Sequence, residues 1–513
     1  MVNERKLKSL YNFFIVKPII VSAWCAVLAF YLLCFIESRF TELSIFFSLF
    51  FFIMFFVLFF LKKKIHFIFA GLFIGSFAVL RLIFIYAEPV SLAESAKVEK
   101  ISAELTGEAS PAGEKYYAAN AKILSVFYKN GAEFSAKGNI KIFFPAEMVL
   151  QNNAYSVSVY KSSGTNALSN FSKGVIFEAS GRFGRKKSGM EPAAFFADKS
   201  LPEFLGWRSP LLKFRAFLRF YLMRLLSGWG SAGALLLALL SANRDFLILP
   251  VSSAFRNAGL SHVLALSGMH VSLVSLTAVQ MGSIFGKKSV AVKFSLISII
   301  IFVWFAGAAP SLNRALGMML LIIIGKSLGL RPPMTSVLSA MLLVHIAVKP
   351  DEALSLGFML SYGALAGILT FGNALFEILN GKIPPKILGA VSASVGAQAF
   401  TAPIVISKIG GIAPIGIIAS VIISPLISVF LIMGIAAIFI SLLFPFTGFI
   451  FSFLLNIVYD FIFILIQIFA QVPLMAAKSF GESLSFSLLP FAAGLVCVWY
   501  SEKILKKREL SLK

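Results

Sequence analysis

Long apolar runs constrain this chain more than any other feature. They lie at 19–36, 43–61 and 65–86 and resume, after a polar interval, at about 265–284, 294–306, 312–330, 334–348, 354–372, 388–407, 411–443, 448–471 and 484–500. Each approaches the roughly 20 residues that cross a bilayer, so they predict about twelve spans. Charged residues make up only 13% of the chain, against about 25% in an average soluble domain. The sequence therefore predicts a mostly α-helical, polytopic membrane bundle.

The basic residues predict how this bundle is oriented. The net charge is +23, and Lys and Arg collect in cytoplasmic loops of membrane proteins. Basic clusters precede the first run, separate the second from the third and follow the last. We therefore expect a multi-pass protein of the inner (plasma) membrane with both termini in the cytoplasm. The first run is followed by Glu37 and Arg39 rather than by a small-residue cleavage site, so a retained helix is expected there.

The polar interval at 91–200 has the pattern of a small β domain. Residues 101–109, 139–144, 155–160 and 175–183 alternate with period two, and Lys129, Asn130 and Gly131 form a turn signal. This pattern predicts strands joined in hairpins. We expect a small antiparallel, barrel-like or half-open sheet outside the membrane.

The end of this interval is basic, with an aromatic ring among the cations. A basic and aromatic face on a small barrel suits single-stranded nucleic acid. The alternative is a solvated linker, or a segment lying on anionic lipid. The candidate residues are Arg182, Phe183, Arg185, Lys186 and Lys187.

The segment after the β domain is amphipathic and then broken. Residues 207–228 have the spacing of a basic amphipathic helix that lies in the membrane interface. Residues 229–262 are too interrupted for a single span, and we expect a re-entrant element. Its polar members should be buried against other helices, because irregular backbone at membrane depth is tolerated only where protein or water covers it. They are Asn243, Arg244, Asp245, Arg256 and Asn257, beside Pro250 and Gly259.

Polar side chains in the middle of the chain form the candidate site. In "SHVLALSGMHVSLV" (261–274), His262, Ser267 and His270 stand among apolar residues, and helical spacing would place them on one side. A second group is Asn313 and Arg314, behind a break at Pro310 and an expected N-cap at Ser311. Gln398 belongs to another polar group, and Gly363 with Gly367 predicts a close helix contact. Such residues generally line the bundle interior or an aqueous cavity.

The order of these groups resembles that of the ComEC-type competence proteins. The residues from Gly259 to Val271 resemble the family signature "GLSHLLAISGLHV", and further blocks match in the same order. They are Gly307, Pro310, Ser311, Arg314 and Ala315, then Gly357, Phe358, Leu360, Ser361, Gly367 and Ile368, then Ala397, Gln398, Pro403 and Pro425. The resemblance covers about 205–445, and it implies that 91–200 is the OB-fold domain of that family.

The resemblance implies a channel that passes single-stranded DNA into the cytoplasm during natural transformation. It places Arg244, Asp245, His262, Ser267, His270, Asn313, Arg314 and Gln398 along the DNA path. The chain then divides into an N-terminal membrane region (1–90), the β domain (91–200), amphipathic and re-entrant helices (201–262), a membrane core (263–500) and a basic tail (501–513).

The sequence departs from the family at several positions. Ala242 and Asn243 replace the usual Gly and Asp, and Met359 stands where Gln is common. Many members also carry a metallo-β-lactamase-like domain, but with four histidines in all its metal ligand set cannot be assembled locally. We therefore expect no enzyme activity, no metal and no cofactor. The expected partners are membrane lipid, single-stranded DNA, a DNA receptor protein, a separate nuclease, a cytoplasmic motor and further copies of the chain.

Two other functions remain open at this point. "ALSG" (265–268) is similar to the serine motif of rhomboid-type proteases, with His345 as the available base on a distant span. A small-molecule permease is the second alternative, because broken helices near the midplane are usual in transporters.

Overall fold

The structure is a computed structural model of the whole chain. It describes residues 18–35, 41–61, 65–86, 97–113, 115–147, 171–184, 192–200, 202–244, 246–283, 288–307, 309–476 and 479–511. The chain divides into two compact units. Unit 1 comprises 1–225 and 346–350, and unit 2 comprises 226–345 and 351–513.

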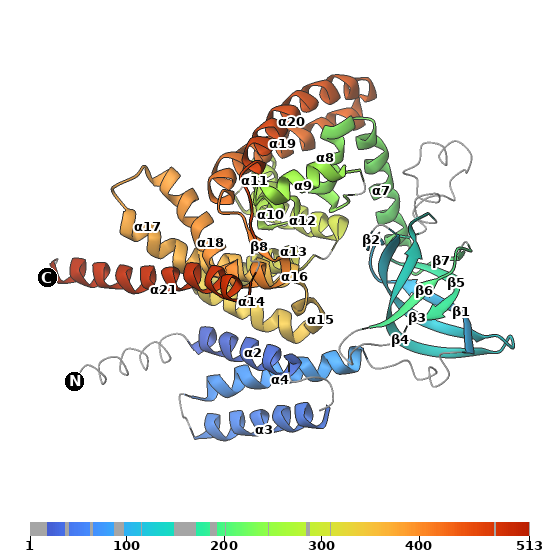
Figure 1. Cartoon of the computed structure of the whole chain (residues 1–513), viewed down its shortest axis with the longest axis horizontal. Coiled ribbons are helices and arrows are strands. Elements are labelled where there is room, and N and C mark those ends of the chain that lie inside the picture. The colour runs from blue at the N-terminus through green and yellow to red at the C-terminus, as the bar shows by residue number, and fades with distance from the viewer. Residues whose placement is uncertain are drawn as a thin grey trace. The chain divides into compact units, whose positions relative to one another are not determined.

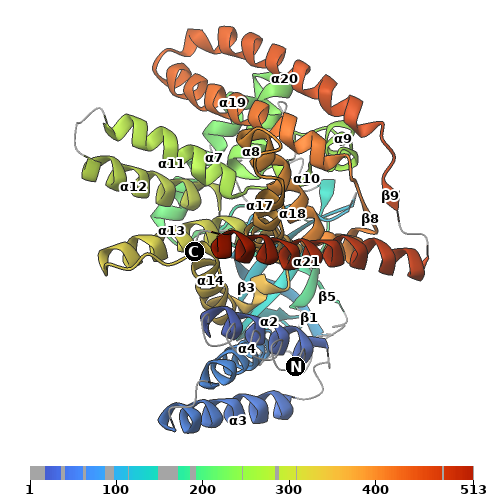
Figure 2. The ribbon, with the colours of Figure 1, turned by 90° about the vertical axis from the view of Figure 1, so that its left-hand side faces the viewer.

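Unit 1 begins with three apolar helices: α2 (Pro18–Phe35), α3 (Thr41–Phe60) and α4 (His66–Ile85). In Figure 1 and Figure 2, α4 lies between the other two. Gly71 and Gly75 of α4 face the backbone of α2, where a Cβ would collide with the carbonyl groups of Ser22 and Ala26. The two helices therefore approach closely because these positions carry no side chain.

The β strands of unit 1 close on themselves. The hydrogen-bonded order is β1-β3-β4-β6-β5-β7, and β1 also pairs with β5, so that five strands form a ring. All pairs are antiparallel except β4 with β6, which is parallel. The expectation of a purely antiparallel sheet was therefore wrong. The strands are β1 (Val98–Leu105), β2 (Ser110–Pro111), β3 (Tyr116–Tyr128), β4 (Glu133–Pro145), β5 (Val175–Phe183), β6 (Ala193–Ala197) and β7 (Glu203–Trp207).

Alternating residues of these strands fill the interior of the ring. Ile140, Ile142 and Phe144 of β4 point inward, and they meet Phe177 of β5 and Phe195 of β6. The turn expected at 129–131 is confirmed, since β3 ends and β4 begins on either side of it and Gly131 has φ 79°. The expected strand at 155–160 lies outside the described residues.

The amphipathic helix after the sheet is confirmed as α7 (Pro210–Ser227). Its Arg215, only 3% exposed, donates a hydrogen bond to Glu108 at 2.6 Å, and Arg219 lies 4.0 Å from the same oxygen. Burial alone would raise the pKa of Glu108, but the two cations and the hydrogen bonds from Arg215 and the Lys173 backbone lower it below its ordinary value. These cations therefore face the β domain.

Unit 2 is almost entirely helical. Among the described residues, the helices that pack most extensively against each other are α11 with α12, α16 with α18, α18 with α21 and α19 with α20. Its elements are α8 (Gly230–Ser241), α9 (Leu249–Asn257), α10 (Ser261–Leu264), α11 (Gly268–Ser283), α12 (Lys288–Ala306), α13 (Pro310–Ser327), α14 (Met334–Val348, whose last residues fall in unit 1), α15 (Pro350–Ala353), α16 (Leu356–Gly367), the π-helical turn η3 (Ile368–Gly372), α17 (Asn373–Leu379), α18 (Pro385–Ile409), β8 (Gly411–Ile412), α19 (Gly416–Leu443), the 3₁₀ turn η4 (Pro445–Thr447), α20 (Gly448–Ala470), β9 (Met475–Ala476) and α21 (Phe480–Ser511).

Several of the helices are long and apolar enough to cross a membrane. Within the described ranges, 7 meet this standard by length and composition, and a further set of shorter apolar helices includes Gly230–Ser241, Val290–Ala306 and Met334–Val348. These helices indicate a membrane protein. The count of about twelve crossings stays a prediction.

The predicted contact through Gly363 and Gly367 is confirmed. A Cβ at Gly367 would collide with the carbonyl oxygen of Gly396 on α18, and one at Gly363 would lie 3.3 Å from Thr401. The two helices therefore meet at van der Waals distance along a line of small residues.

The interruption predicted within 229–262 is present between α8 and α9. Ala242 ends α8 in the left-handed region, with φ 58°. The burial expected for the polar set was wrong in part, because Arg244, Pro250 and Arg256 are exposed in unit 2. Arg256 points outward because apolar residues of α9, such as Val251 and Phe255, occupy the buried face of that helix, whereas Arg244 lies in the link before it.

Candidate functional site

The stretch from Ser261 to Val274 is broken in the middle. It forms α10 and then α11, and Ala265, the residue after α10, has extended backbone. His262 and His270 therefore lie on different helices, which corrects the expectation that they share one helical side. His262 is exposed on α10, whereas His270 is buried.

Ser267 and His270 together cap the first turn of α11. The Ser267 hydroxyl accepts a hydrogen bond from the backbone N–H of Met269 at 3.3 Å. His270 Nδ1 accepts from the backbone N–H of Ser267 at 3.1 Å and lies 3.2 Å from the Ser267 hydroxyl. This is the reciprocal arrangement of a capping box, with histidine in the position usually held by Glu or Gln. The other ring nitrogen, Nε2, is buried and has no hydrogen-bond partner among the described residues.

The start of α13 is hydrogen-bonded to the residue before this cap. Pro310 occupies the first helical position, as expected, but Ala309 is the N-cap. Ser311 is not the cap, because its hydroxyl donates instead to the carbonyl oxygen of Leu266. This bond ties the first turn of α13 to the residue that precedes the Ser267 cap.

Arg314 lies in the second turn of α13 and is only 9% exposed. Its guanidinium donates to the carbonyl oxygen of Ser361 on α16 and lies 5.8 Å from the ring centre of Tyr362. Its Nε has no hydrogen-bond partner in the described part of the chain, and no ion pair of Arg314 occurs there. A Cβ on Gly268 would lie 3.6 Å from its Nη2. The cation therefore reaches the first turn of α11, where the chain carries no side chain.

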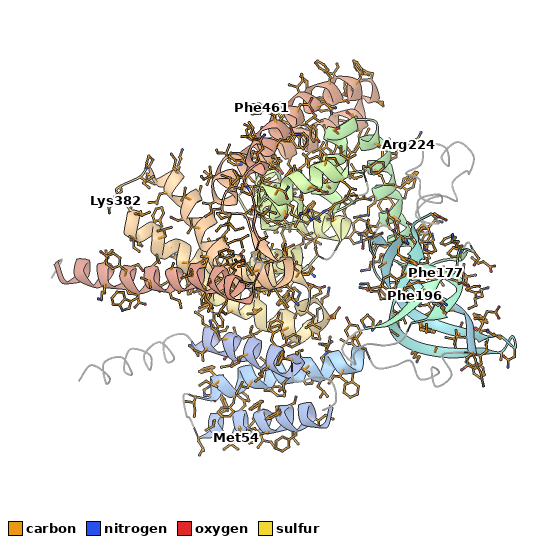
Figure 3. The ribbon with its side chains drawn as sticks, in the orientation of Figure 1. Met54, Phe177, Phe196, Arg224, Lys382 and Phe461 are labelled. Carbon is orange, nitrogen blue, oxygen red and sulfur yellow. The ribbon has the colours of Figure 1, made fainter. Side chains whose placement is uncertain are left out.

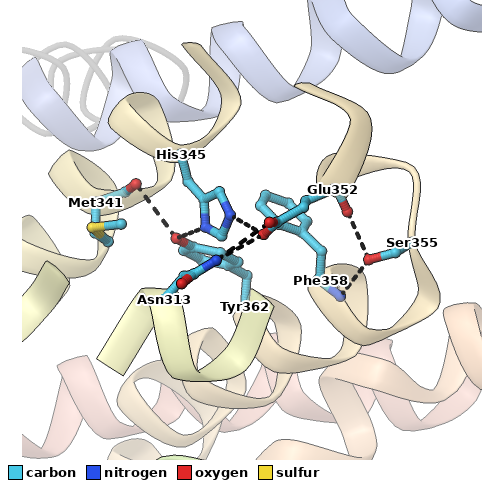
Figure 4. A network of polar contacts seen from close by, with 7 residues as sticks. All are labelled: Asn313, Met341, His345, Glu352, Ser355, Phe358 and Tyr362. Carbon is cyan, nitrogen blue, oxygen red and sulfur yellow. Dashed lines mark hydrogen bonds and ion pairs between the residues drawn. The ribbon is translucent and has the colours of Figure 1, made fainter. Parts of the chain in front are cut away.

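A polar network joins side chains of α13, α14, α15 and α16 (Figure 4). His345 of α14 contacts Glu352 of α15 through Nε2 at 2.8 Å and the hydroxyl of Tyr362 through Nδ1 at 3.0 Å. The Asn313 amide donates to both carboxylate oxygens of Glu352, at 3.3 Å and 3.1 Å. Tyr362 also reaches the backbone carbonyl of Met341, at 3.4 Å. Asn313 thus joins this network through Glu352, and Arg314 meets it at the ring of Tyr362.

The candidate site is therefore a meeting point of helix ends. The first turn of α11, the first two turns of α13, the last turn of α14, the short helix α15 and the second turn of α16 supply its polar groups. The sequence predicted Ser267, His270, Asn313 and Arg314 as members, and the structure brings all four into this corner. It singled out neither Glu352, which follows Pro350 in a link between apolar runs, nor Tyr362, which lies within an apolar run.

The other predicted path residues lie elsewhere in unit 2. Arg244 donates to the carbonyl oxygen of Leu264 at 3.1 Å, next to α10. Gln398 lies on α18, where its amide nitrogen is 3.1 Å from the place a Cβ would take on Gly416. Asp245 is outside the described residues. In the described part of the chain, no hydrogen bond or ion pair joins Arg244, His262 or Gln398 to Arg314, so their part in a common path stays a prediction.

The predicted nucleic-acid residues of the β domain divide between its two faces. Arg182 is exposed, whereas Phe183 points inward and packs edge-on against Phe195 at 5.0 Å. Stacking of a base on Phe183 is therefore not supported, because strand alternation turns this ring into the core. Arg185, Lys186 and Lys187 lie outside the described residues.

Three other rings lie on the outer face of the sheet, and the sequence did not single them out. Phe143 of β4 stacks on Phe196 of β6 at 4.9 Å, and Tyr116 of β3 meets both edge-on at 6.5 Å and 6.1 Å. Phe196 pairs in register with Arg182, and Lys141 lies 5.6 Å from the centre of the Phe143 ring. We call Tyr116, Phe143, Phe196, Lys141 and Arg182 the aromatic platform. Figure 3 labels Phe196 of the platform and Phe177 of the core.

Among the described residues, no group of three or more His, Cys, Asp or Glu side chains could hold a metal ion. The candidate site is thus built from hydrogen-bond donors, a cation and a single carboxylate. These groups suit recognition of an anion more than metal chemistry.

A set of long apolar helices with a separate small β domain defines a helical membrane protein. The model of the competence protein family matches residues 239–503, which is more than half of the chain. The chain therefore belongs to the competence protein family, and this membership indicates a role in DNA uptake. No curated protein and no solved structure matches it.

Proposed function

We propose that this chain is an inner-membrane channel component that passes single-stranded DNA into the cytoplasm during natural transformation. The observation that carries the proposal is Arg314, a buried cation with no ion pair in the described part of the chain. Removing a charge from water costs several kcal/mol unless a partner compensates it. A phosphate of a passing strand is such a partner, since guanidinium groups bind phosphate with paired, charge-assisted hydrogen bonds.

The neighbours of Arg314 favour the same ligand. The buried Nε2 of His270 has no hydrogen-bond partner in the described structure, and with Nδ1 accepting from the Ser267 backbone N–H, Nε2 carries the proton. Gly268 leaves the space beside the guanidinium without a side chain. The first turns of α11 and α13 add the partial positive charge of helix N-termini.

The proposal includes an orientation in the membrane. With about twelve crossings and cytoplasmic termini, the starts of α11, α13 and α16 and the end of α14 lie at the outer side. Arg314 would then meet the strand at the entrance of its path, and the β domain would stand outside the membrane. The basic residues at Lys326, Arg331, Lys382 and Lys386 fall on the inner side in this arrangement.

The β domain would capture the strand before it enters. Its closed order β1-β3-β4-β6-β5 with one parallel pair supports the OB-like fold that the resemblance implies, a five-stranded barrel that often binds single strands. The aromatic platform supplies rings for base stacking and cations for phosphates. Capture by this face needs no sequence-specific contact.

An intramembrane serine hydrolase remains the alternative, with His270 in place of His345 as the base, because the Ser267 hydroxyl lies 3.2 Å from His270 Nδ1 whereas His345 contacts Tyr362 and Glu352. The same atoms satisfy the first turn of α11, which accounts for the pair without catalysis. A hydrolase would be labelled at Ser267 by an activity-based serine probe. The channel component should stay unlabelled.

Uptake of labelled DNA by cells carrying substituted chains tests the proposal. Arg314→Ala and His270→Ala should each lower entry of DNA into the cytoplasm at least tenfold, at equal protein abundance, because each removes a group facing the strand. Arg331→Ala, an exposed arginine after the other end of α13, is the matched control and should leave uptake unchanged. Normal uptake in both site variants would end the assignment.

A further inference from the structure

We propose that His345, Glu352 and Tyr362 form a proton-binding site, and that its occupancy sets the charge beside Arg314. The first part stands on the network alone. The second part rests on the proposed function, because it assumes that Arg314 receives the phosphates of the strand.

The side chains of His345, Glu352 and Tyr362 are joined to one another by hydrogen bonds. His345 is 3% exposed, and both of its nitrogens have partners, Glu352 at 2.8 Å and Tyr362 at 3.0 Å. The ring of Phe358 packs edge-on against the imidazole at 5.0 Å. The Asn313 amide donates to both oxygens of Glu352, which favours the ionised carboxylate. A proton entering the network therefore goes to His345.

The network can hold this proton without leaving a donor unsatisfied. With neutral His345, Nε2–H donates to Glu352, and the Tyr362 hydroxyl donates to Nδ1. When a proton from the aqueous phase binds Nδ1, the new N–H donates to the Tyr362 oxygen. The Tyr362 hydroxyl then turns to the Met341 carbonyl, 3.4 Å away. In both protonation states every donor of His345 and Tyr362 has an acceptor, because the Tyr362 hydroxyl can donate either to His345 or to the Met341 carbonyl. This matters because a buried donor without an acceptor is costly.

Several charged groups adjoin the network in the described part of the chain, and Arg81 donates to the carbonyl oxygen of Ala347, two residues after His345. The guanidinium of Arg314 on α13 lies 5.8 Å from the centre of the Tyr362 ring, Asp351 stands beside Glu352 on α15, and Lys349 precedes α15. With neutral His345 the carboxylate of Glu352 offsets part of the charge of Arg314. With protonated His345 that carboxylate is compensated, so the corner becomes more positive and holds phosphate more tightly.

Infrared difference spectroscopy of the full chain in lipid nanodiscs tests the proton site directly. With isotope-labelled histidine, lowering the pH from 8 to 6 should produce an imidazolium signal that His345→Gln removes. Tyr362→Phe keeps the ring beside Arg314 but removes the hydroxyl, and it should weaken the signal, because the new N–H of His345 then loses its acceptor. His66→Gln, a histidine of α4, is the control and should retain it. An unchanged signal in both His345→Gln and Tyr362→Phe would overturn the proton site.

Binding of a fluorescent single-stranded 12-mer to the same samples tests the link to DNA. Wild type should bind roughly tenfold more tightly at pH 6 than at pH 8, the size expected of one nearby unit charge. His345→Gln should show the weaker value at both pH values, and Glu352→Gln the tighter value at both. If both variants keep the wild-type pH dependence, the link is wrong. If wild type binds no oligonucleotide at either pH, the proposed function fails while the infrared result still decides the proton site.

Discussion

At the scale of single residues, the motif "SGMH" has a structural explanation that precedes any function. Ser267 and His270 satisfy backbone donors at the start of α11, a task that usually falls to Ser with Glu or Gln. Histidine does the same without adding a negative charge beside Arg314. This choice suits a place where an anion is to bind.

The ion cluster between the β domain and α7 leads to a prediction on pH and stability. Because the folded-state pKa of Glu108 is lowered, its contribution is present above the unfolded value of about 4.3 and is lost as the pH falls through the folded value. Glu108→Gln should destabilise the β domain by about 2–3 kcal/mol at pH 7, because Arg215 and Arg219 lose their carboxylate. Its stability should also fall less between pH 5 and pH 3 than that of wild type.

Amide hydrogen exchange of the β strands in the full chain measures this effect. Glu147→Gln is the control, because the Glu147 pair with Lys199 is 72% and 82% exposed and such pairs contribute little. Equal protection in Glu108→Gln and wild type at pH 7 would refute the role of the cluster.

Residue by residue, the sequence predicted the site only in part. Ser267, His270 and Arg314 could be found because polar groups in apolar runs are costly and hence informative. Glu352 could not, since an acid in a link between apolar runs is ordinary in sequence. Phe183 was placed on the wrong face because alternation tells which residues share a face but not which face is inside.

At the scale of elements, the aromatic platform supports a second prediction. Stacking of a base on an aromatic side chain is worth about 1–3 kcal/mol by alanine substitution. Phe143→Ala and Phe196→Ala should therefore weaken binding of a single-stranded oligonucleotide by about 5- to 150-fold. Quenching of 2-aminopurine within the oligonucleotide reports the stacking.

The matched control for the platform is on the same strand. Phe134 of β4 is 45% exposed and lies near the hairpin turn, where it contacts Tyr128. Phe134→Ala should leave both affinity and quenching unchanged. Equal losses in all three variants would mean that the rings support the sheet and do not receive bases.

Helices and strands were predicted best where apolar residues recur with the period of a helix or of a strand. The strands expected at 139–144 and 175–183 and the helix expected at 207–228 correspond to β4, β5 and α7, with β4 extending further toward its start than expected. The parallel pairing of β4 with β6 could not be foreseen, because β6 is short and its partner is set by closure of the ring. Likewise, the break before α11 depends on a cap that only the contact of Ser267 with His270 reveals.

At the scale of the whole molecule, the remaining question is which side of the membrane each part faces. If the basic loops are cytoplasmic, then Lys137 on β4 and Lys382 in the loop after α17 must lie on opposite sides. Lys137→Cys and Lys382→Cys can be made singly after replacing Cys25, Cys34 and Cys497, the three native cysteines. Both positions are exposed in the structure, so burial would not prevent reaction with a membrane-impermeant maleimide. We expect labelling of position 137 in cells whose inner membrane is intact, and of position 382 only after that membrane is opened. Labelling of both positions in cells whose inner membrane is intact would place the starts of α11, α13 and α16 at the cytoplasmic end, and Arg314 could not then be the entrance of an inward path.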